Sequence, residues 1–163
     1  MNDRAELTYM NKGDKKILGF LRTNARQTLT KISKDTRMPI STVFDRLKQM
    51  EKTGVILRHT SLLDMKKIGF NVQVFLFIKA NRNHKNELEK CLVENPNVNS
   101  MVKINGEWNY ILETLFGDIN SLESFVDDVK NDFKEITISV HYALKDLKRE
   151  SFLMDNAENF LDP

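Results

Sequence analysis

The side chains most able to make specific contacts in this sequence are gathered between Pro39 and Thr60. One set recurs at a spacing that turns its members to one side of a helix, namely Ser41, Thr42, Asp45, Lys48, Gln49 and Lys52. Hydroxyl, amide and carboxylate groups can bond to base edges, while ammonium groups suit phosphates. The hydroxyl, amide and carboxylate members are therefore the expected base readers, and the two lysines are the expected phosphate contacts.

A second group of candidates lies at helix ends and in the segment after that helix, where contacts to a nucleic-acid backbone are usual. Its members are Thr28, Thr30, Lys31, Arg37, Arg58 and His59. For each of them the alternative is an ordinary solvated side chain. Arg46 falls on the flank of the helix nearer the core, where it can either clamp a phosphate or pair with a carboxylate of a neighbouring helix.

No catalytic or metal-binding constellation stands out. His59, His84 and His141 stand at unrelated positions, and the single cysteine, Cys91, falls on the apolar stripe of a predicted helix. A cysteine placed in this way is more often a small buried hydrophobe than a nucleophile. We therefore predict no enzyme activity, no cofactor and no metal.

The pattern of apolar residues is that of a cytoplasmic chain without a membrane segment. The longest uninterrupted apolar stretch is Val74 to Ile78, far below the roughly 20 residues that a membrane span needs. One cysteine excludes an intrachain disulfide, and residues 1–10 do not resemble an export signal.

Charge divides the chain into two unlike halves. The net charge of +2 separates, near Gly69, into 15 Lys and Arg against 7 Asp and Glu before Asn71, a net +8, and 10 against 16 afterwards, a net −6. Clustered cations give the sequence-independent part of nucleic-acid affinity by releasing counterions. The basic half is thus expected to meet a polyanion.

Three short helices are expected to position the contact residues of the basic half. Apolar periodicity predicts them at Asn11 to Thr23, Thr28 to Thr36 and Ile40 to Thr53, with Gly54 ending the third. Three such helices with a tight turn before the last form a helix-turn-helix. The β-rich run from Val55 to Leu63 predicts the wing of a winged helix.

The acidic half alternates between strands and helices in the order βαββαβ, the ferredoxin-like plan. The expected elements are strands at Asn71 to Ala80, Val98 to Ile104, Tyr110 to Phe116 and Ile136 to Leu144, and helices at Asn83 to Glu94 and Ser121 to Phe133. Phe75, Phe77, Phe116 and Phe125 are expected in the core. Because both alternating sets of strand residues are apolar, we expect a second subunit to cover the outer face of the sheet.

The predicted fold class is therefore α+β, with two domains. Residues 1–63 form a winged helix-turn-helix DNA-binding domain, 64–70 a linker, 71–147 a ferredoxin-like oligomerisation domain, and 148–163 a C-terminal tail. The tail carries enough apolar residues for a short packing helix, the alternative being a disordered end.

A collinear series of short motifs resembles the Lrp/AsnC family, the feast/famine regulators, over about residues 10 to 147. The matching segments are Asp14-Lys15-Lys16-Ile17-Leu18, Asn24-Ala25-Arg26, Ser41-Thr42-Val43-Phe44-Asp45-Arg46-Leu47, Glu51-Lys52-Thr53-Gly54-Val55-Ile56, Lys66-Lys67-Ile68-Gly69 and Gly106-Glu107-Trp108-Asn109. The resemblance implies a sequence-specific transcriptional regulator that binds double-stranded DNA as a dimer, tetramer or octamer. It also implies an amino-acid or other small-molecule effector near Gly106, Trp108 and Asn109.

Two positions depart from the family pattern. Pro39 stands where the family often has a serine that caps the recognition helix, and Asn109 stands where the hairpin has an aspartate. An amide makes no charge-assisted bond to the ammonium of an amino acid, so the second departure weakens that attraction.

Two other functions are open to a chain with this pattern. Some proteins that resemble the family are sirohaem decarboxylases, which would use histidine and arginine of the second domain, here mainly Arg82, His84, His141 and Arg149. The other alternative is a sensor or assembly module without DNA binding. The positive charge of the first domain and the outward Lys48, Gln49 and Lys52 favour DNA over both.

Overall fold

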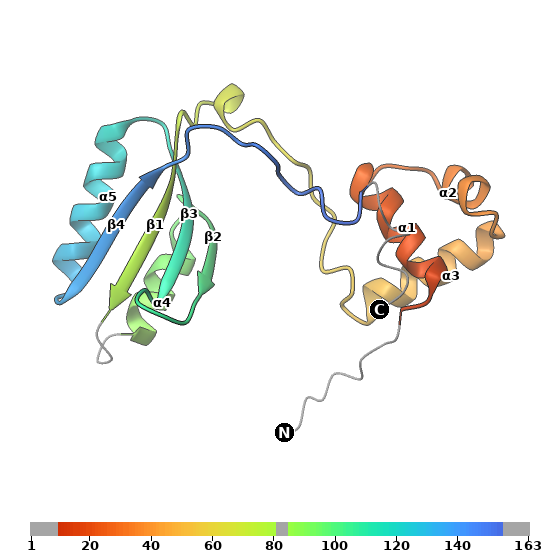
Figure 1. The fold of residues 1–163 in the computed structure, drawn as a ribbon, viewed down its shortest axis with the longest axis horizontal. Helices are drawn as coiled ribbons and strands as arrows, with labels where there is room; N and C mark the ends of the chain where they lie inside the picture. The colour runs from red at the N-terminus through yellow and green to blue at the C-terminus, as the bar shows by residue number, and fades with distance from the viewer. Residues whose placement is uncertain (1–9, 81–84, 155–163) are drawn as a thin grey trace, which may run out of the picture. The chain divides into compact units, whose positions relative to one another are not determined.

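The computed structural model describes residues 10–80 and 85–154, which divide into two compact units (Figure 1). The first unit contains the chain up to residue 62 and also the chain from residue 147 onward, and the second contains residues 63–146. The first unit is thus assembled from both ends of the described chain. Within the described ranges, no helix is long and apolar enough to cross a membrane.

The first unit holds the predicted helices as α1 (Lys12–Thr23), α2 (Leu29–Thr36) and α3 (Ile40–Lys52). A reciprocal capping box begins α1: the Asn11 side chain accepts from the Asp14 amide at 3.0 Å, and the Asp14 carboxylate accepts from the Asn11 amide at 3.2 Å. Thr28 caps α2 by accepting from the Lys31 amide at 3.3 Å. These side-chain bonds satisfy amides that have no partner within a helix.

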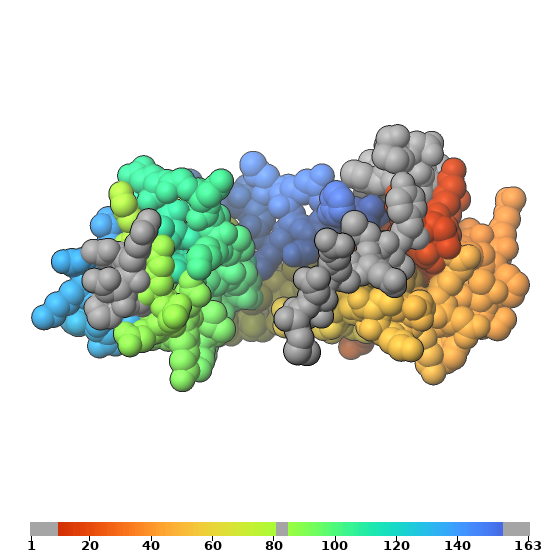
Figure 2. Space-filling model, turned by 90° about the horizontal axis from the view of Figure 1, so that it is seen from below, coloured from red at the N-terminus to blue at the C-terminus, as the bar shows by residue number. Residues whose placement is uncertain are grey.

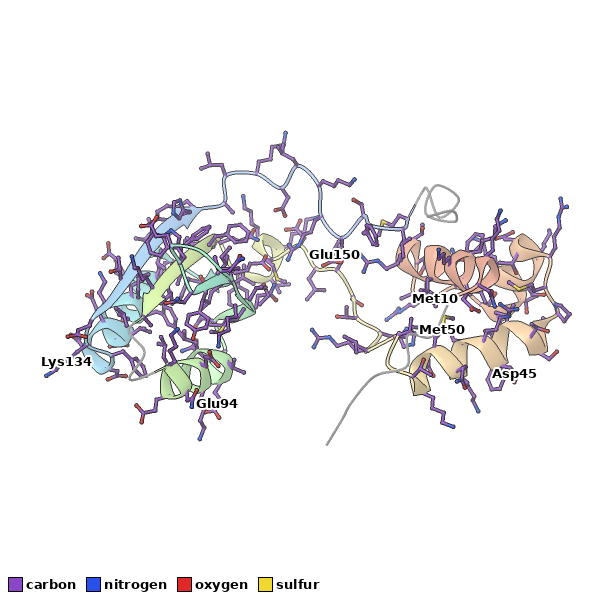
Figure 3. The ribbon with its side chains drawn as sticks, turned by 60° about the horizontal axis from the view of Figure 1, so that its bottom comes forward. Met10, Asp45, Met50, Glu94, Lys134 and Glu150 are labelled. Atoms are coloured by element: carbon purple, nitrogen blue, oxygen red, sulfur yellow. The ribbon has the colours of Figure 1, made fainter. Side chains whose placement is uncertain are left out.

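A small apolar core joins the three helices. Ile17, Ile32 and Val43 are fully buried and come one from each helix, and Met50 joins them from the end of α3. In Figure 3, Met50 lies on the side of α3 that faces α1, beside Met10, which also packs against this core. The buried positions on α3 therefore fix which of its faces is left outward.

The run from Val55 to Leu63, expected to form the wing, contains no strand. Val55 and Ile56 pack against the helical core, but no residue from Leu57 to Leu63 lies in a strand. The described part of the first unit contains no other strand. A β-rich sequence needs an edge to pair with, and without one it runs as an extended segment with Leu57 88% exposed.

The C-terminal segment is held against the end of α1 by one arginine. Arg22 donates to the carboxylate of Glu150 at 2.7 Å and to its carbonyl oxygen at 2.8 Å, and also to the carbonyl oxygen of Phe152 at 3.3 Å. The predicted packing helix is not formed by residues 148–154, and the rest of the predicted tail, residues 155–163, lies outside the described residues.

The second unit is the predicted βαββαβ fold. Its sheet has the order β2-β3-β1-β4 with every pair antiparallel, which is the ferredoxin-like arrangement. The elements are a 3-10 turn at Lys66–Ile68, β1 (Val72–Ala80), α4 (Lys85–Glu94), β2 (Val98–Lys103), β3 (Tyr110–Phe116), α5 (Ile119–Asp132) and β4 (Ile136–Tyr142). Asp118 caps α5 by accepting from the Ser121 amide at 2.8 Å.

One face of the sheet carries the core of this unit. Val74, Leu76 and Ile78 of β1 are fully buried and pack with the apolar side chains of α4 and α5. Cys91 lies half-buried beside this core, as expected of a small hydrophobe, and burial raises the pKa of its thiol. Tyr110 is buried with its hydroxyl 2.6 Å from the Glu89 carboxylate, and burial followed by that bond raises the pKa of Tyr110 to about 12.

The opposite face of the sheet has no helix over it in the described chain. Phe116 and Phe125 lie in the core as expected, but Phe75 is 37% exposed and Phe77 is half-buried. Phe77 packs edge-on against Trp108 and His141, with ring centroids 6.1 and 4.9 Å away. The expectation that Phe75 and Phe77 are core residues was therefore wrong for the single chain, because alternation places them on the outer face.

Candidate nucleic-acid interface

The outward face of α3 carries the residues predicted to contact DNA. Ser41, Asp45 and Gln49 are exposed together with both lysines, whereas Thr42 is half-buried. None of these six side chains makes a hydrogen bond or ion pair with another described residue. In Figure 2 the orange and yellow atoms of the first unit belong to α2, α3 and the segment that follows α3. Their donors and acceptors are thus available to a partner.

The turn between α2 and α3 sets where this face begins. Arg37 ends α2 in the left-handed region, with a φ of 58°, and its amide donates to the Ser33 carbonyl. Pro39 stands at the N-cap of α3 and makes no side-chain cap bond. The loss of the hydroxyl cap, expected from the sequence, leaves the first-turn amides of α3 without a side-chain partner there.

Arg46 ties α3 to the beginning of α1. Its guanidinium bonds to the Asp14 carboxylate at 2.8 Å and also to the Asn11 side chain. Gly13 makes room for it, since a Cβ at that position would lie 2.8 Å from the guanidinium nitrogen. Of the two roles weighed from the sequence, the described contacts are those of a pair with a neighbouring carboxylate.

The remaining predicted contact residues have mixed surroundings. Thr30, Lys31 and Arg58 are exposed, and Thr28 is engaged in capping α2. His59 lies 3.0 Å from the Glu51 carboxylate, measured from its Nε2 atom. The structure therefore gives His59 a protein partner that sequence reasoning missed, because the two residues meet only when the chain turns at the end of α3.

Two apolar side chains on α3 were not among the predicted contacts. Ile40 is 47% exposed and Phe44 is 41% exposed, one turn apart on the same side of the helix. The Lys48 ammonium lies over the Phe44 ring, 4.6 Å from its centroid. For Phe44 the signal was present in the sequence, since it lies outside the Val43, Leu47 and Met50 periodicity of the core, whereas Ile40, three residues before Val43, lies at the edge of that stripe.

In the second unit, the residues predicted to bind an effector form the β2–β3 hairpin. Gly106 has a φ of 113°, which favours glycine, and Trp108 packs against Phe77. The Asn109 side-chain oxygen accepts from the Ala80 amide at 2.8 Å, so it closes the end of β1. Asn109 therefore has a structural bond that sequence reasoning did not foresee.

One hollow of the second unit lies away from this hairpin. It is open, has a volume of about 490 Å³, and is lined by Asn95, Asn97, Asn120, Ser121, Ser124, Phe125 and Asp128. Asn97 donates to the Leu115 carbonyl at 2.8 Å, which places the hollow at the far end of β3 from the hairpin.

Only two of the residues that a decarboxylase would use lie in the described chain. Arg82 and His84 lie outside the described residues, His141 packs on Phe77 in the second unit, and Arg149 belongs to the first unit. No group of three or more potential metal ligands occurs among the residues that the structure describes.

Two family models match the chain in the order of its units. A winged helix-turn-helix DNA-binding model matches residues 10–56, and the Lrp/AsnC ligand binding domain model matches residues 73–152. The chain belongs to the Lrp/AsnC family. Like the regulators of this family, it is a sequence-specific DNA-binding transcriptional regulator.

Individual relatives of this Lrp/AsnC protein agree with that assignment. It is 28% identical over 116 residues to the HTH-type transcriptional regulator FL11 of Pyrococcus furiosus, covering 71% of this chain and 77% of the relative. It is 26% identical over 143 residues to the glutamate uptake regulatory protein of Zymomonas mobilis, covering 86% and 87%. The solved NMB0573/L-Met complex of Neisseria meningitidis, a transcriptional regulator, matches with a TM-score of 0.78 and 26% identity, covering 86% of this chain and 93% of that one.

The role of Arg46 predicts a loss of stability without a loss of phosphate contact. We expect Arg46→Ala to lower the free energy of unfolding by about 1–2 kcal/mol. The Arg46–Asp14 ion pair is half-buried, so its loss should cost more than that of an exposed ion pair and less than that of a fully buried one. Lys48→Ala, two positions along the same helix, should change stability by less than about 0.5 kcal/mol. Urea denaturation followed by helical circular dichroism measures both, and equal effects of the two substitutions would contradict the assigned role.

Proposed function

We propose that this Lrp/AsnC regulator inserts α3 into the major groove of double-stranded DNA. The carrying observation is the outward face of α3, where base-compatible and cationic side chains have no polar partner in the described chain. In this proposal Ser41, Thr42, Asp45 and Gln49 read bases, and Lys48 and Lys52 contact phosphates.

Backbone contacts from the flanks complete the proposed interface. Arg37, Lys31 and Arg58 are exposed cations, and Thr30 is an exposed hydroxyl residue in the first turn of α2. Arg37 occupies a left-handed position that costs a non-glycine residue about 1–2 kcal/mol. We propose that a contact between the Arg37 guanidinium and a DNA phosphate offsets this cost. We leave Arg46 and His59 out of the interface, because each already has a protein partner.

We also propose that the protein acts as a dimer or larger oligomer through its ferredoxin-like unit. The outer face of the sheet offers Phe75 and Phe77, and the segment after α3 offers Leu57, Leu62 and Leu63, all at least partly exposed. A dimer with two-fold symmetry sets two α3 helices into successive major grooves about 34 Å apart, so the operator would be a pseudo-palindrome. We assign residues 64–70 to the linker between the two functions.

The third part of the proposal is an amino-acid effector at the Gly106 hairpin. It is supported by the match to a ligand binding domain and by the L-Met complex of the Neisseria meningitidis regulator. Here the position holds an amide, Asn109, which carries no charge to attract the ammonium of an amino acid. Its side-chain oxygen also already accepts from the Ala80 amide. The proposed effector affinity is correspondingly modest.

The phosphate contacts predict a steep dependence of DNA binding on salt. With the DNA upstream of its own gene, Lys48→Ala and Lys52→Ala should each reduce the slope of log K against log salt by about 0.9 per bound subunit. Mobility-shift titrations at four salt concentrations measure the slope. Lys134→Ala, an exposed lysine of the second unit, is the matched control and should leave it unchanged. A slope that neither α3 variant alters would contradict the assignment.

The open sheet face predicts that a charge on it prevents self-association. Phe75→Lys should convert the dimer or larger oligomer to a monomer, because an unpaired ammonium would have to be buried between two sheets. Sedimentation velocity measures the mass. Val93→Lys places the same charge on an exposed apolar position of α4 and should leave the mass unchanged. A wild-type monomer, or an oligomer that survives Phe75→Lys, would refute this part of the proposal.

The amide at Asn109 predicts that effector binding can be strengthened by one atom. Asn109→Asp keeps an oxygen for the Ala80 amide and adds a charge, so amino-acid affinity should rise roughly tenfold. Titration calorimetry with each of the twenty amino acids measures it. Asn105→Asp adds the same charge at an exposed position of the hairpin and should have a smaller effect. If neither the wild type nor the variant gives heat with any amino acid, the proposal of an amino-acid effector is refuted.

A further inference from the structure

Phe44 is an aromatic ring left exposed on the helix that faces DNA in the proposed function. It is 41% exposed although Val43, its neighbour on α3, is fully buried. Ile40 lies one turn earlier on the same side and is 47% exposed. The two side chains form a narrow apolar strip along the first half of α3, which is the half that enters the groove in a helix-turn-helix.

A cation holds the ring in place. The Lys48 ammonium lies 4.6 Å from the centroid of Phe44, one turn further along α3. Lys48 makes no ion pair with a described carboxylate, so the ring is its only polar or ring contact among the described residues. An attraction between the cation and the ring face limits the rotation of both side chains. This contact therefore favours one arrangement of the Phe44 ring in the absence of a partner.

The neighbours of Phe44 identify the kind of partner. The strip is flanked by Ser41, Asp45 and Lys48, all exposed, so two apolar side chains are set in a polar and cationic surface. A strip of two residues is too small for a stable protein interface, which needs a much larger buried area. In the major groove, the one apolar group that a base presents is the 5-methyl group of thymine, and phenylalanine is among the side chains that contact it.

We propose that Phe44 reads a thymine in each half-site of the operator by packing against its 5-methyl group. Lys48 then serves two purposes, since it orients the ring and reaches a phosphate beside the same base pair. This inference rests on the proposed function, because it requires α3 to lie in the major groove. It adds Phe44 to the residues that determine specificity.

The test replaces single thymines by deoxyuracil, which lacks only the methyl group. The full-length protein first selects duplexes from a randomised library, and each thymine of the selected duplex is then replaced in turn. For the wild type, one replacement per half-site should weaken binding about three- to fivefold, as expected for the loss of one buried methyl. For Phe44→Ala, the thymine and deoxyuracil duplexes should bind with equal affinity.

Controls separate this contact from a general loss of binding. Val93→Ala, which shortens an exposed apolar side chain on α4, should keep the wild-type preference for thymine. Phe44→Met, a flexible apolar side chain with high helix propensity, should keep part of the preference, and thermal unfolding should show all variants folded. Selection of no duplex at all would overturn the proposed function together with this inference. Selection followed by indifference to deoxyuracil at every thymine, or by a preference that survives Phe44→Ala, would overturn this inference alone.

Discussion

The orientation of α3 depends on a very small apolar core. Ile17, Ile32 and Val43 each contribute one fully buried side chain, and burial of each stabilises the unit by about 1.5–3 kcal/mol. Apolar contact is not directional in itself, but the burial of Val43 and Met50 sets which face of α3 is turned inward. The guanidinium of Arg46 adds a directional contact, because its Nη1 atom donates both to the Asp14 carboxylate and to the Asn11 side chain at the start of α1. The position of every outward residue on α3 follows from this arrangement.

Most of the fold could be predicted from the sequence where the signal is local. The three helices of the first unit follow from apolar spacing, and their boundaries follow from caps such as Asn11 and Thr28. The strands of the second unit follow from alternation, and Gly106 from the need for positive φ in the hairpin. Each of these features is decided by residues within a few positions of one another.

The predictions that were wrong or left open share a dependence on distant partners. The segment after α3 has β propensity, but a strand exists only if another strand lies beside it, and the first unit supplies none in its described part. Phe75 alternates with core residues, yet the described residues cover only one face of the sheet. The partner of Arg46 lies 32 residues away.

The contact of the C-terminal segment with α1 determines how this regulator can be divided into fragments. Arg22 bonds to Glu150 and to the backbone of Phe152, so a fragment that stops after residue 62 lacks a piece of its own first unit. A chimera that joins this first unit to a foreign sensor should therefore insert the sensor between residues 62 and 147. It should keep the chain up to residue 62 and the chain from residue 147 onward. In such a design the sensor is inserted into the DNA-binding unit, so both ends of the sensor are covalently joined to the unit that it is meant to control.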